Sequence, residues 1–258
     1  MTVGIRGMGL IGGSFEKAFR AAGCDVLNLR DASARDVGCC SLVVVCLPPL
    51  LVAPWVRDHA DDFADGALVV DAAGVKGVVC DALAEAARTA RWTFVGGHPM
   101  AGREVSGYAN SDAALFRGAS MILTPYAWTP PEAVERLKEM LAPVGFARFV
   151  VTDPAHHDEM IAFTSQLAHV VSSAYVRDPL SSSHAGYSAG SYQDMTRVAT
   201  MDPDIWTDLF LANREPLCAV LDGLMTRLSA YRDAVCAGDS ESLRCMLAEG
   251  RAAKERTR

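Results

Sequence analysis

Short β-branched and aliphatic runs alternate with segments of helical period through the first 150 residues. The runs that predict strands are Val3–Ile5, Val26–Leu29, Leu42–Cys46, Leu68–Val70, Thr93–Val95, Ser120–Leu123 and Arg148–Val151. Ile11–Ala22 and Val79–Ala90 carry the apolar spacing and small residues of helices that pack on a sheet. This alternation predicts repeated βαβ units, and therefore an α/β fold with a doubly wound, mostly parallel sheet.

The pattern changes beyond residue 152, where strand signals stop. Asp153-Pro154 and Asp202-Pro203 each place a capping aspartate before a proline, and the residues after them are helix formers to the end of the sequence. We therefore expect two domains, a sheet domain over residues 1–152 and an all-helical domain over residues 153–258. No flexible linker separates them, so we expect a shared interface at which a ligand could bind.

Two proline-containing stretches predict local structure in the sheet domain. Thr129-Pro130-Pro131-Glu132 has the pattern of a capping box and predicts a helix that runs to about Leu141. Residues 37–56 carry no charge and match a membrane span in length, but three prolines interrupt them. A buried strand followed by a proline-rich turn explains this stretch better, so we expect no membrane span.

Composition narrows the classes of function. The chain has 258 residues, is 50% hydrophobic and carries a formal net charge of −7, which excludes disorder and leaves no basic face for nucleic acid. Its eight cysteines form no CxxC pair and no Cys/His cluster of metal-site spacing, so we expect reduced core thiols and no metal. The N-terminus has no basic segment typical of a secretory signal, which favours a cytoplasmic protein.

A glycine-rich segment follows the first predicted strand and opens the first predicted helix. Its sequence, GMGLIG at residues 7–12, fits the GxGxxG pattern of dinucleotide-binding loops. Gly7 would allow the tight turn, Gly9 the approach of a pyrophosphate to the backbone, and Gly12 the close packing of helix on strand. The helix N-terminus, with Leu10 and Ile11, would face the anion. This context favours a Rossmann-type cofactor site over a turn that binds nothing.

The end of the second predicted strand bears on the choice between NAD and NADP. In dinucleotide-binding sheets an acidic residue at this point binds the ribose 2′-hydroxyl. Here Arg30 takes that position and Asp31 follows it. Arginine suits the 2′-phosphate of NADP, whereas a shift of one residue would let Asp31 bind the hydroxyl of NAD. We expect NAD or NADP as the cofactor, and Arg30 favours NADP.

A second glycine-rich segment, GGHPMAGREVSG at residues 96–107, follows the strand predicted at Thr93–Val95. Ligands of open α/β sheets bind beyond the carboxyl ends of the strands, which would put His98 at the cofactor cleft. An enzyme that oxidises an alcohol by hydride transfer needs a group to accept the hydroxyl proton. A neutral imidazole, with a pKa of about 6.5, suits that task near pH 7. His98 is therefore the candidate catalytic base, although a His-Pro pair can also simply end a turn.

Together with a third segment, these motifs resemble the prephenate and arogenate dehydrogenase family of tyrosine biosynthesis. The third segment comprises GSYQDMTRVA at residues 190–199 and DPDIWTDLFLANR at residues 202–214. The resemblance implies an oxidoreductase that decarboxylates prephenate to 4-hydroxyphenylpyruvate, or arogenate to tyrosine, with NAD(P) as the oxidant. It also implies a homodimer built through the helical domains.

The resemblance implies roles for individual residues. His98 is similar to the family's catalytic histidine, which bonds the C4 hydroxyl of the substrate's cyclohexadiene ring. Glu104 is similar to the loop acid that shapes and gates the pocket. Arg197 is similar to the arginine that binds a substrate carboxylate, a task that suits the guanidinium fork, although a surface ion pair with a nearby aspartate would also account for it. His169 matches the last histidine of a Ser-His-Leu-Pro-His motif.

Two segments depart from the family pattern. SQLAH at residues 165–169 lacks the first histidine and the proline of that motif, and Gly74 stands where many members have a serine. The missing hydroxyl would remove one contact to the histidine or to the substrate. His169 also lies on a small, polar face of a predicted helix, opposite an apolar stripe that includes Met160 and Phe163. Such a face is either solvated or, as the resemblance favours, the wall of a ligand pocket.

Two other functions share parts of the pattern. An NAD(P)-dependent reductase of similar two-domain plan, acting on an imine or a β-hydroxyacid, would share the glycine loop but would not explain HPMAG at residues 98–102. A catalytically silent, cofactor-binding homologue would explain the departures at Gly74 and Gln166.

Overall fold

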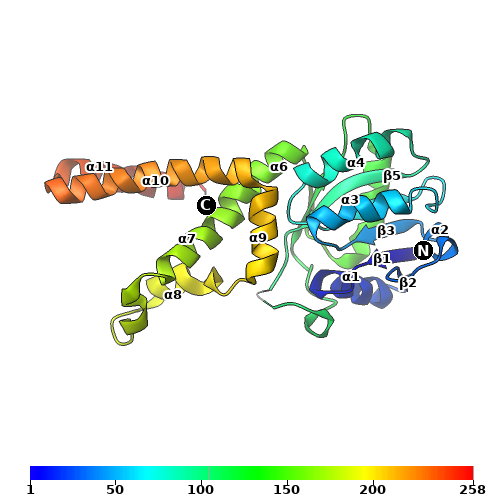
Figure 1. The fold of residues 1–258 in the computed structure, drawn as a ribbon, viewed down its shortest axis with the longest axis horizontal. Coiled ribbons are helices and arrows are strands. Elements are labelled where there is room, and N and C mark those ends of the chain that lie inside the picture. The colour runs from blue at the N-terminus through cyan, green and yellow to red at the C-terminus, as the bar shows by residue number, and fades with distance from the viewer. Residues whose placement is uncertain (104, 258) are drawn as a thin grey trace. The chain divides into compact units, whose positions relative to one another are not determined.

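A computed structural model describes residues 1–103 and 105–257 of the chain. Seven strands form one sheet in the order β2-β1-β3-β4-β5-β6-β7 (Figure 1). Their bounds are Thr2–Arg6, Asp25–Asn28, Leu42–Val45, Leu68–Asp71, Thr93–Pro99, Ser120–Thr124 and Arg148–Val151 for β1 to β7. All neighbours pair in parallel except β5 with β6. The predicted α/β class and mostly parallel sheet are confirmed.

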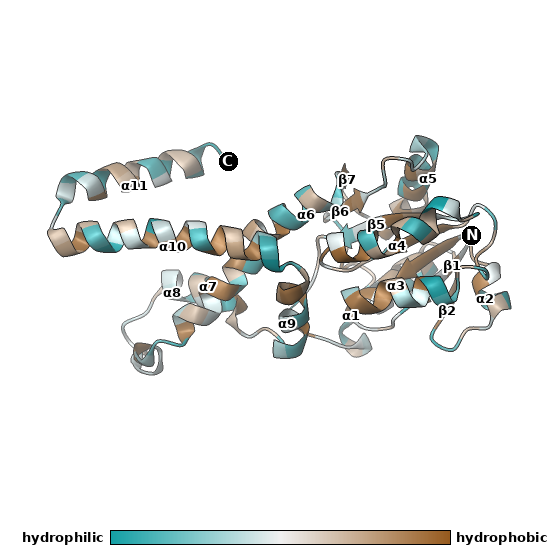
Figure 2. Ribbon diagram, turned by 45° about the horizontal axis from the view of Figure 1, so that its top comes forward, coloured by the Kyte–Doolittle hydropathy of each residue, from teal (hydrophilic) through white to brown (hydrophobic). Residues whose placement is uncertain are grey.

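Helices cover both faces of the sheet, whose inner strands are mostly apolar. β3 and β4 are buried along their whole length, and Figure 2 shows the inner strands in the hydrophobic colour. On one face, α1 (Leu10–Ala21) and α5 (Pro131–Leu141) pack their apolar sides into the core. On the other face lie α2 (Ala34–Gly38), α3 (Pro49–Asp58) and α4 (Gly77–Thr89). Burial on both faces explains why the strands are runs of valine and leucine without polar alternation.

Two local predictions for proline-rich segments are wrong. The turn expected after β3 is the helix α3, which tolerates Pro49 because the first helical turn needs no N–H there. The capping box expected at Thr129 does not form, since the Thr129 hydroxyl accepts a hydrogen bond from the backbone N–H of Tyr126 at 3.0 Å. The N-cap of α5 is Pro130, without a side-chain hydrogen bond.

Further corrections concern the cysteines. Cys39, Cys218, Cys236 and Cys245 are exposed, so the expectation of core thiols is wrong for these four. All eight cysteines are free thiols. No helix among the described residues is both long and apolar enough to cross a membrane.

The region after β7 is helical throughout its described part. It contains the helices α6 (Pro154–Ile161), α7 (Leu167–Val176), α8 (Gly190–Thr196), α9 (Pro203–Ala212), α10 (Arg214–Ala237) and α11 (Ser240–Glu255). A π-helical turn, η3 (Ala162–Gln166), and two short turns, η4 (Pro179–Ser183) and η5 (Arg197–Ala199), lie between them. Two further short turns, η1 (Tyr108–Asn110) and η2 (Ala142–Val144), lie before β7. Asp153 and Asp202 cap α6 and α9 as predicted. The chain divides into two compact units, Met1–Arg214 and Glu215–Arg258. The sheet and helices α6 to α9 therefore belong to one unit.

Candidate active site

The glycine loop between β1 and α1 is shaped by backbone contacts. Gly7 has a φ of +96°, and a Cβ atom on it would lie 2.1 Å from the carbonyl oxygen of Cys46. A Cβ on Gly12 would lie 1.8 Å from the carbonyl oxygen of Gly7, so both positions require glycine. A Cβ on Gly9 would meet nothing within 4 Å. The space at Gly9, at a helix N-terminus without a side-chain cap, fits the approach of a pyrophosphate.

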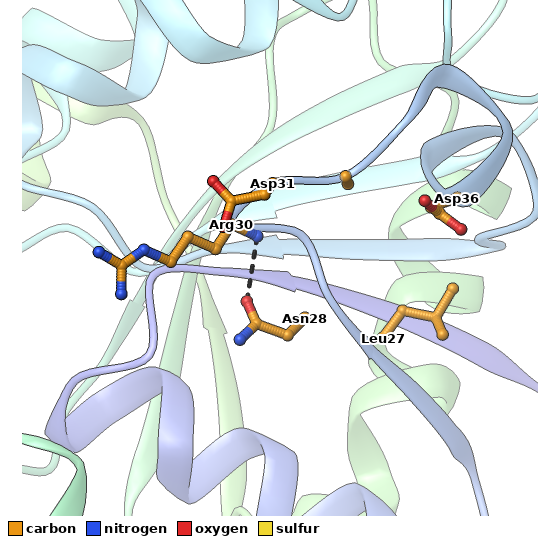
Figure 3. Close-up of a pocket in the computed structure, with 6 residues that line it drawn as sticks. Leu27, Asn28, Arg30, Asp31 and Asp36 are labelled. Carbon is orange, nitrogen blue, oxygen red and sulfur yellow. Dashed lines mark hydrogen bonds between the residues drawn. The ribbon is translucent and has the colours of Figure 1, made fainter.

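The end of β2 forms a surface pocket of mixed charge. Arg30 and Asp31 line it together with Asn28 and Asp36, and Arg30 donates its backbone N–H to the Asn28 Oδ1 at 3.0 Å (Figure 3). Figure 3 shows the Arg30 guanidinium extending away from Asp36. Asp36 accepts hydrogen bonds from the hydroxyl and backbone N–H of Ser33, and the hydroxyl bond is the main cause of its lowered pKa. The pocket thus offers both a cation and carboxylates.

His98 lies near the end of β5, opposite Ile122 of the neighbouring antiparallel strand β6, and is half-buried. Its Nδ1 atom is 2.9 Å from Nε2 of His157, whose Nδ1 is 2.7 Å from Oδ1 of Asp158. The Asp158 carboxylate also accepts the backbone N–H groups of Lys76 at 2.7 Å and Gly77 at 2.8 Å, where α4 begins. A continuous chain of hydrogen bonds therefore links His98 to the N-terminus of α4.

The surroundings of His98 keep its ring neutral. Burial is the largest cause that lowers its pKa well below the usual 6.5, and the neighbouring His157 and the positive charge of Lys76 lower it further. Burial also lowers the pKa of His157, against the opposing effect of its hydrogen bond to Asp158. Both rings are thus neutral at pH 7, and His98 is able to act as a base.

A second buried charge network fixes the strand ends next to His98. Lys76 is completely buried, and its ammonium group pairs with Asp71 and donates to the carbonyl oxygen of Gly97 at 2.6 Å. Asp71 also accepts the N–H groups of Gly97 at 3.0 Å and Ala73 at 2.9 Å. Lys76 therefore joins the ends of β4 and β5 inside the protein.

Nε2 of His98, the ring nitrogen that does not meet His157, lies close to Gly74, which in turn lies close to α9. A Cβ atom on Gly74 would be 3.9 Å from Nε2 of His98 and 3.2 Å from a methyl group of Leu209 on α9. The space that a serine side chain would use is thus bordered by Leu209. Gly74 is thus a neighbour of Nε2 of His98.

His169 and Gln166 both contact α9. The His169 ring stacks on Trp206 with centroids 3.7 Å apart, and its Nδ1 is 2.9 Å from the carbonyl oxygen of Ser165. Gln166, which replaces the family's histidine, is buried; it donates to the carbonyl oxygen of Leu209 at 3.1 Å and accepts from Asn213 at 2.8 Å. Gln166 therefore holds α9 in place.

The polar face predicted around His169 is turned inward. Gln166 and Ser172 are buried on it, whereas Met160 and Phe163 of the apolar stripe are 45% and 55% exposed. Arg197 is exposed on η5, which packs against α7. Glu104 lies outside the described residues.

The segment after His98 is tied to the dinucleotide-binding helix. The Tyr108 hydroxyl donates to Glu16 at 2.9 Å, and the Lys17 ammonium donates to the carbonyl oxygen of Ser111 at 2.7 Å. These contacts from α1 couple the position of the His98 segment to the glycine loop. Nothing in the sequence pattern indicated them.

Sequence reasoning missed Asp71, Lys76, His157 and Asp158. His98 lies 59 residues from His157, and Asp158 lies 82 residues from the Lys76 N–H that it accepts, so periodicity gives no signal for these contacts. The adjacent His157-Asp158 pair in the first helix after β7 is a signal that could have drawn attention, because neighbouring titratable residues are common at functional sites.

Comparisons with known proteins bear on the whole chain. The family described as prephenate dehydrogenase, nucleotide-binding domain, matches residues 7–151, and the family described as prephenate dehydrogenase, dimerization domain, matches residues 153–249. A prephenate dehydrogenase from Bacillus subtilis is 29% identical over 94% of this chain and 72% of its own length. A cyclohexadienyl dehydrogenase from Zymomonas mobilis is 30% identical over 93% of this chain and 90% of its own length.

A solved structure agrees with these sequence matches. Prephenate dehydrogenase from A. aeolicus, in complex with hydroxyphenyl propionate and NAD+, has a TM-score of 0.85 and 26% identity, covering 100% of this chain and 98% of that one. The two domain matches follow one another in the order of the fold described above. The chain therefore belongs to the prephenate dehydrogenase family and contains its nucleotide-binding domain.

Proposed function

We propose that the protein catalyses the NAD(P)-dependent oxidative decarboxylation of prephenate to 4-hydroxyphenylpyruvate, or of arogenate to tyrosine. The observation that carries the proposal is the position of His98, whose Nε2 faces Gly74 in the same compact unit as an open glycine loop. Burial lowers the pKa of this ring. The names of the Bacillus subtilis and Zymomonas mobilis relatives support the same class of reaction.

The glycine loop fits a nicotinamide dinucleotide. Gly9 leaves space for the pyrophosphate, and the N–H groups of Leu10 and Ile11 open α1 beside it. Gly7 and Gly12 keep the loop tight enough for that approach. When bound, the nicotinamide ring supplies a hydride acceptor.

We propose His98 as the general base that accepts the proton of the substrate's C4 hydroxyl and later returns it. Its Nε2 accepts the proton of the C4 hydroxyl as hydride leaves C4, which turns C4 into a carbonyl. The C1 carboxylate then departs as CO2, its bonding pair enters the ring, and the ring becomes aromatic. The resulting phenolate oxygen recovers the proton from His98, so atoms and charge balance. Aromatisation supplies much of the driving force, and the protein's main task is to position the reactants.

We assign the substrate's carboxylate to Arg197, and we propose His169 and Gly74 as further substrate-binding residues. Glu104, the remaining candidate from the resemblance, lies outside the described residues. Arg197→Ala is expected to raise KM for the substrate with a smaller effect on kcat, since a guanidinium that clamps a carboxylate binds ground state and transition state alike. An unchanged KM in steady-state assays would place Arg197 outside the pocket.

Exposed residues bear on two further proposals, the preference for NADP over NAD and the assembly of a homodimer. Arg30 supports NADP as the preferred coenzyme, and Asp31 in the same pocket is the residue that would serve NAD. A homodimer is supported by the dimerization-domain match and by large apolar side chains left exposed on α6, η3 and α9, among them Met160, Phe163 and Leu211.

Steady-state assays of both substrates with both coenzymes test the proposal. We expect turnover of prephenate or arogenate, with a higher kcat/KM for NADP than for NAD. Coenzyme binding without turnover of either substrate would favour a silent homologue. Turnover of an imine or a β-hydroxyacid alone would favour the alternative reductase.

A further inference from the structure

A neutral histidine can accept a proton only on the ring nitrogen that carries none. His98 contacts Nε2 of His157 through its Nδ1 atom, at 2.9 Å. One of these two nitrogens must therefore carry the hydrogen and the other must accept it. The direction of this single bond decides whether Nε2 of His98 is an acceptor or a donor.

Asp158 fixes the direction from the far end of the chain. Its carboxylate accepts two backbone N–H groups, from Lys76 and Gly77, at the positive end of the α4 dipole. An ionised carboxylate only accepts hydrogen bonds. The 2.7 Å contact to Nδ1 of His157 therefore requires the hydrogen on His157.

His157 is buried and has charged groups on two sides, the Asp158 carboxylate and the Lys76 ammonium. Its burial and the Lys76 charge favour the neutral ring. With Nδ1 protonated, the neutral ring must leave Nε2 as an acceptor. The hydrogen in the contact between the two histidines then belongs to Nδ1 of His98.

We propose that His157, oriented by Asp158, is a positioning residue that holds His98 with its proton on Nδ1 and so presents an unprotonated Nε2 to the substrate hydroxyl. The catalytic part of this inference rests on the proposed function, but the tautomer does not. The same logic operates in Ser-His-Asp triads, where a buried carboxylate selects the histidine tautomer. His157 meets Nδ1 of His98, whereas Gly74 lies near Nε2 and offers no hydroxyl to it.

Nitrogen-15 NMR of the histidine rings tests the tautomer directly. The chain has six histidines, and the His98→Gln and His157→Gln variants assign the two signals that matter. In the unliganded wild-type protein we expect both rings to carry the proton on Nδ1. A proton on Nε2 of His98 would overturn the proposal, whatever the enzyme's activity.

Two variants of His157 separate positioning from general structure. His157→Leu removes the acceptor, so we expect His98 to lose the Nδ1–H form and kcat to fall by about 10²-fold, with KM for both substrates changed less than about 3-fold. His157→Gln restores an acceptor oxygen, and we expect it to recover the Nδ1–H form and most of kcat. The matched control is His156→Leu at the adjacent, 60% exposed histidine, which should leave both unchanged.

The outcomes distinguish this inference from the proposed function. If His157→Leu keeps full kcat and the Nδ1–H form of His98, the inference is wrong even though the enzyme is active. If wild type shows the expected tautomers but turns over neither substrate, the proposed function fails and the tautomer assignment stands. Should His157→Leu not fold, the wild-type spectrum and His157→Gln still decide the matter.

Discussion

The glycine loop and the His98 centre lie in one compact unit but are built in opposite ways. The loop uses backbone from one short segment, where Gly7 and Gly12 are needed because added carbon atoms would clash. The His98 centre uses side chains from β5 and α6, His98 and His157, which hydrogen bonds join to the buried carboxylate of Asp158. That carboxylate in turn accepts backbone N–H groups at the start of α4. Substitutions that add atoms to the loop should therefore disturb it most. The His98 centre should be disturbed most by substitutions that remove a titratable or charged side chain.

The largest effect is expected at the His98 centre itself. His98→Gln removes the proton acceptor, and kcat should fall by the ~10²- to 10⁴-fold typical of a lost general base. Coenzyme affinity, measured by calorimetric titration, should stay unchanged because the glycine loop is intact. A loss of coenzyme binding equal to the loss of kcat would show that the two regions are not separable.

The buried pair of Asp71 and Lys76 tests how much stability the charges near His98 require. Asp71→Asn leaves the buried ammonium of Lys76 without its carboxylate and should lower the free energy of unfolding by about 3–5 kcal/mol in urea titrations. The matched control is Asp65→Asn, which breaks a pair with Arg91 whose partners are each 71% exposed, and should cost less than about 1 kcal/mol. Equal effects would contradict the structural role of the buried pair.

The glycine loop predicts a contrast between two alanine variants. Gly9→Ala adds a carbon to open space, so the protein should keep its stability and lose coenzyme affinity by about 10-fold or more, equal to about 1.4 kcal/mol. Gly12→Ala adds a carbon 1.8 Å from the Gly7 carbonyl oxygen and should also lower stability, by about 1–3 kcal/mol. Gly9→Ala with wild-type coenzyme affinity would remove the pyrophosphate from this position.

The smallest effect concerns pH. Because the pKa values of His98 and His157 are lowered in the folded state, the unfolded chain binds more protons as pH falls below about 6.5. Stability should therefore decline as pH drops through 6.5, while kcat/KM should stay level until well below that pH. A pH–rate profile with its acid limb at or above 6.5 would contradict the neutral His98 ring.

The contrast between a site built from one local segment and a site built from distant side chains also explains which features could be predicted from the sequence. The strands and the glycine loop are local patterns, and β7 has the predicted bounds. The His98 partner could not be predicted, because His157 lies 59 residues away in the sequence, and Asp158 lies 82 residues from the Lys76 N–H that it accepts. Periodicity reports which face of an element is apolar and carries no information on such distant pairing.

The inward polar face of the helical segment formed by α6, η3 and α7 shows a second limit of prediction from sequence. The apolar stripe with Met160 and Phe163 would ordinarily face the core, yet these side chains are exposed in the single chain, while Gln166 is buried. The partner that covers an apolar stripe cannot be inferred from one sequence, so the stripe indicated a helix but not its orientation. The role of Gln166 in holding α9 likewise depends on Asn213, 47 residues away.

The central claim is that hydride removal at C4 is coupled to loss of the C1 carboxylate, with His98 as the proton acceptor. The most direct test measures CO2 release and coenzyme reduction in the same reaction, for wild type and His98→Gln. The account predicts one CO2 per reduced coenzyme in wild type, and both rates lowered together in the variant. Coenzyme reduction without CO2, or wild-type rates in His98→Gln, would contradict it.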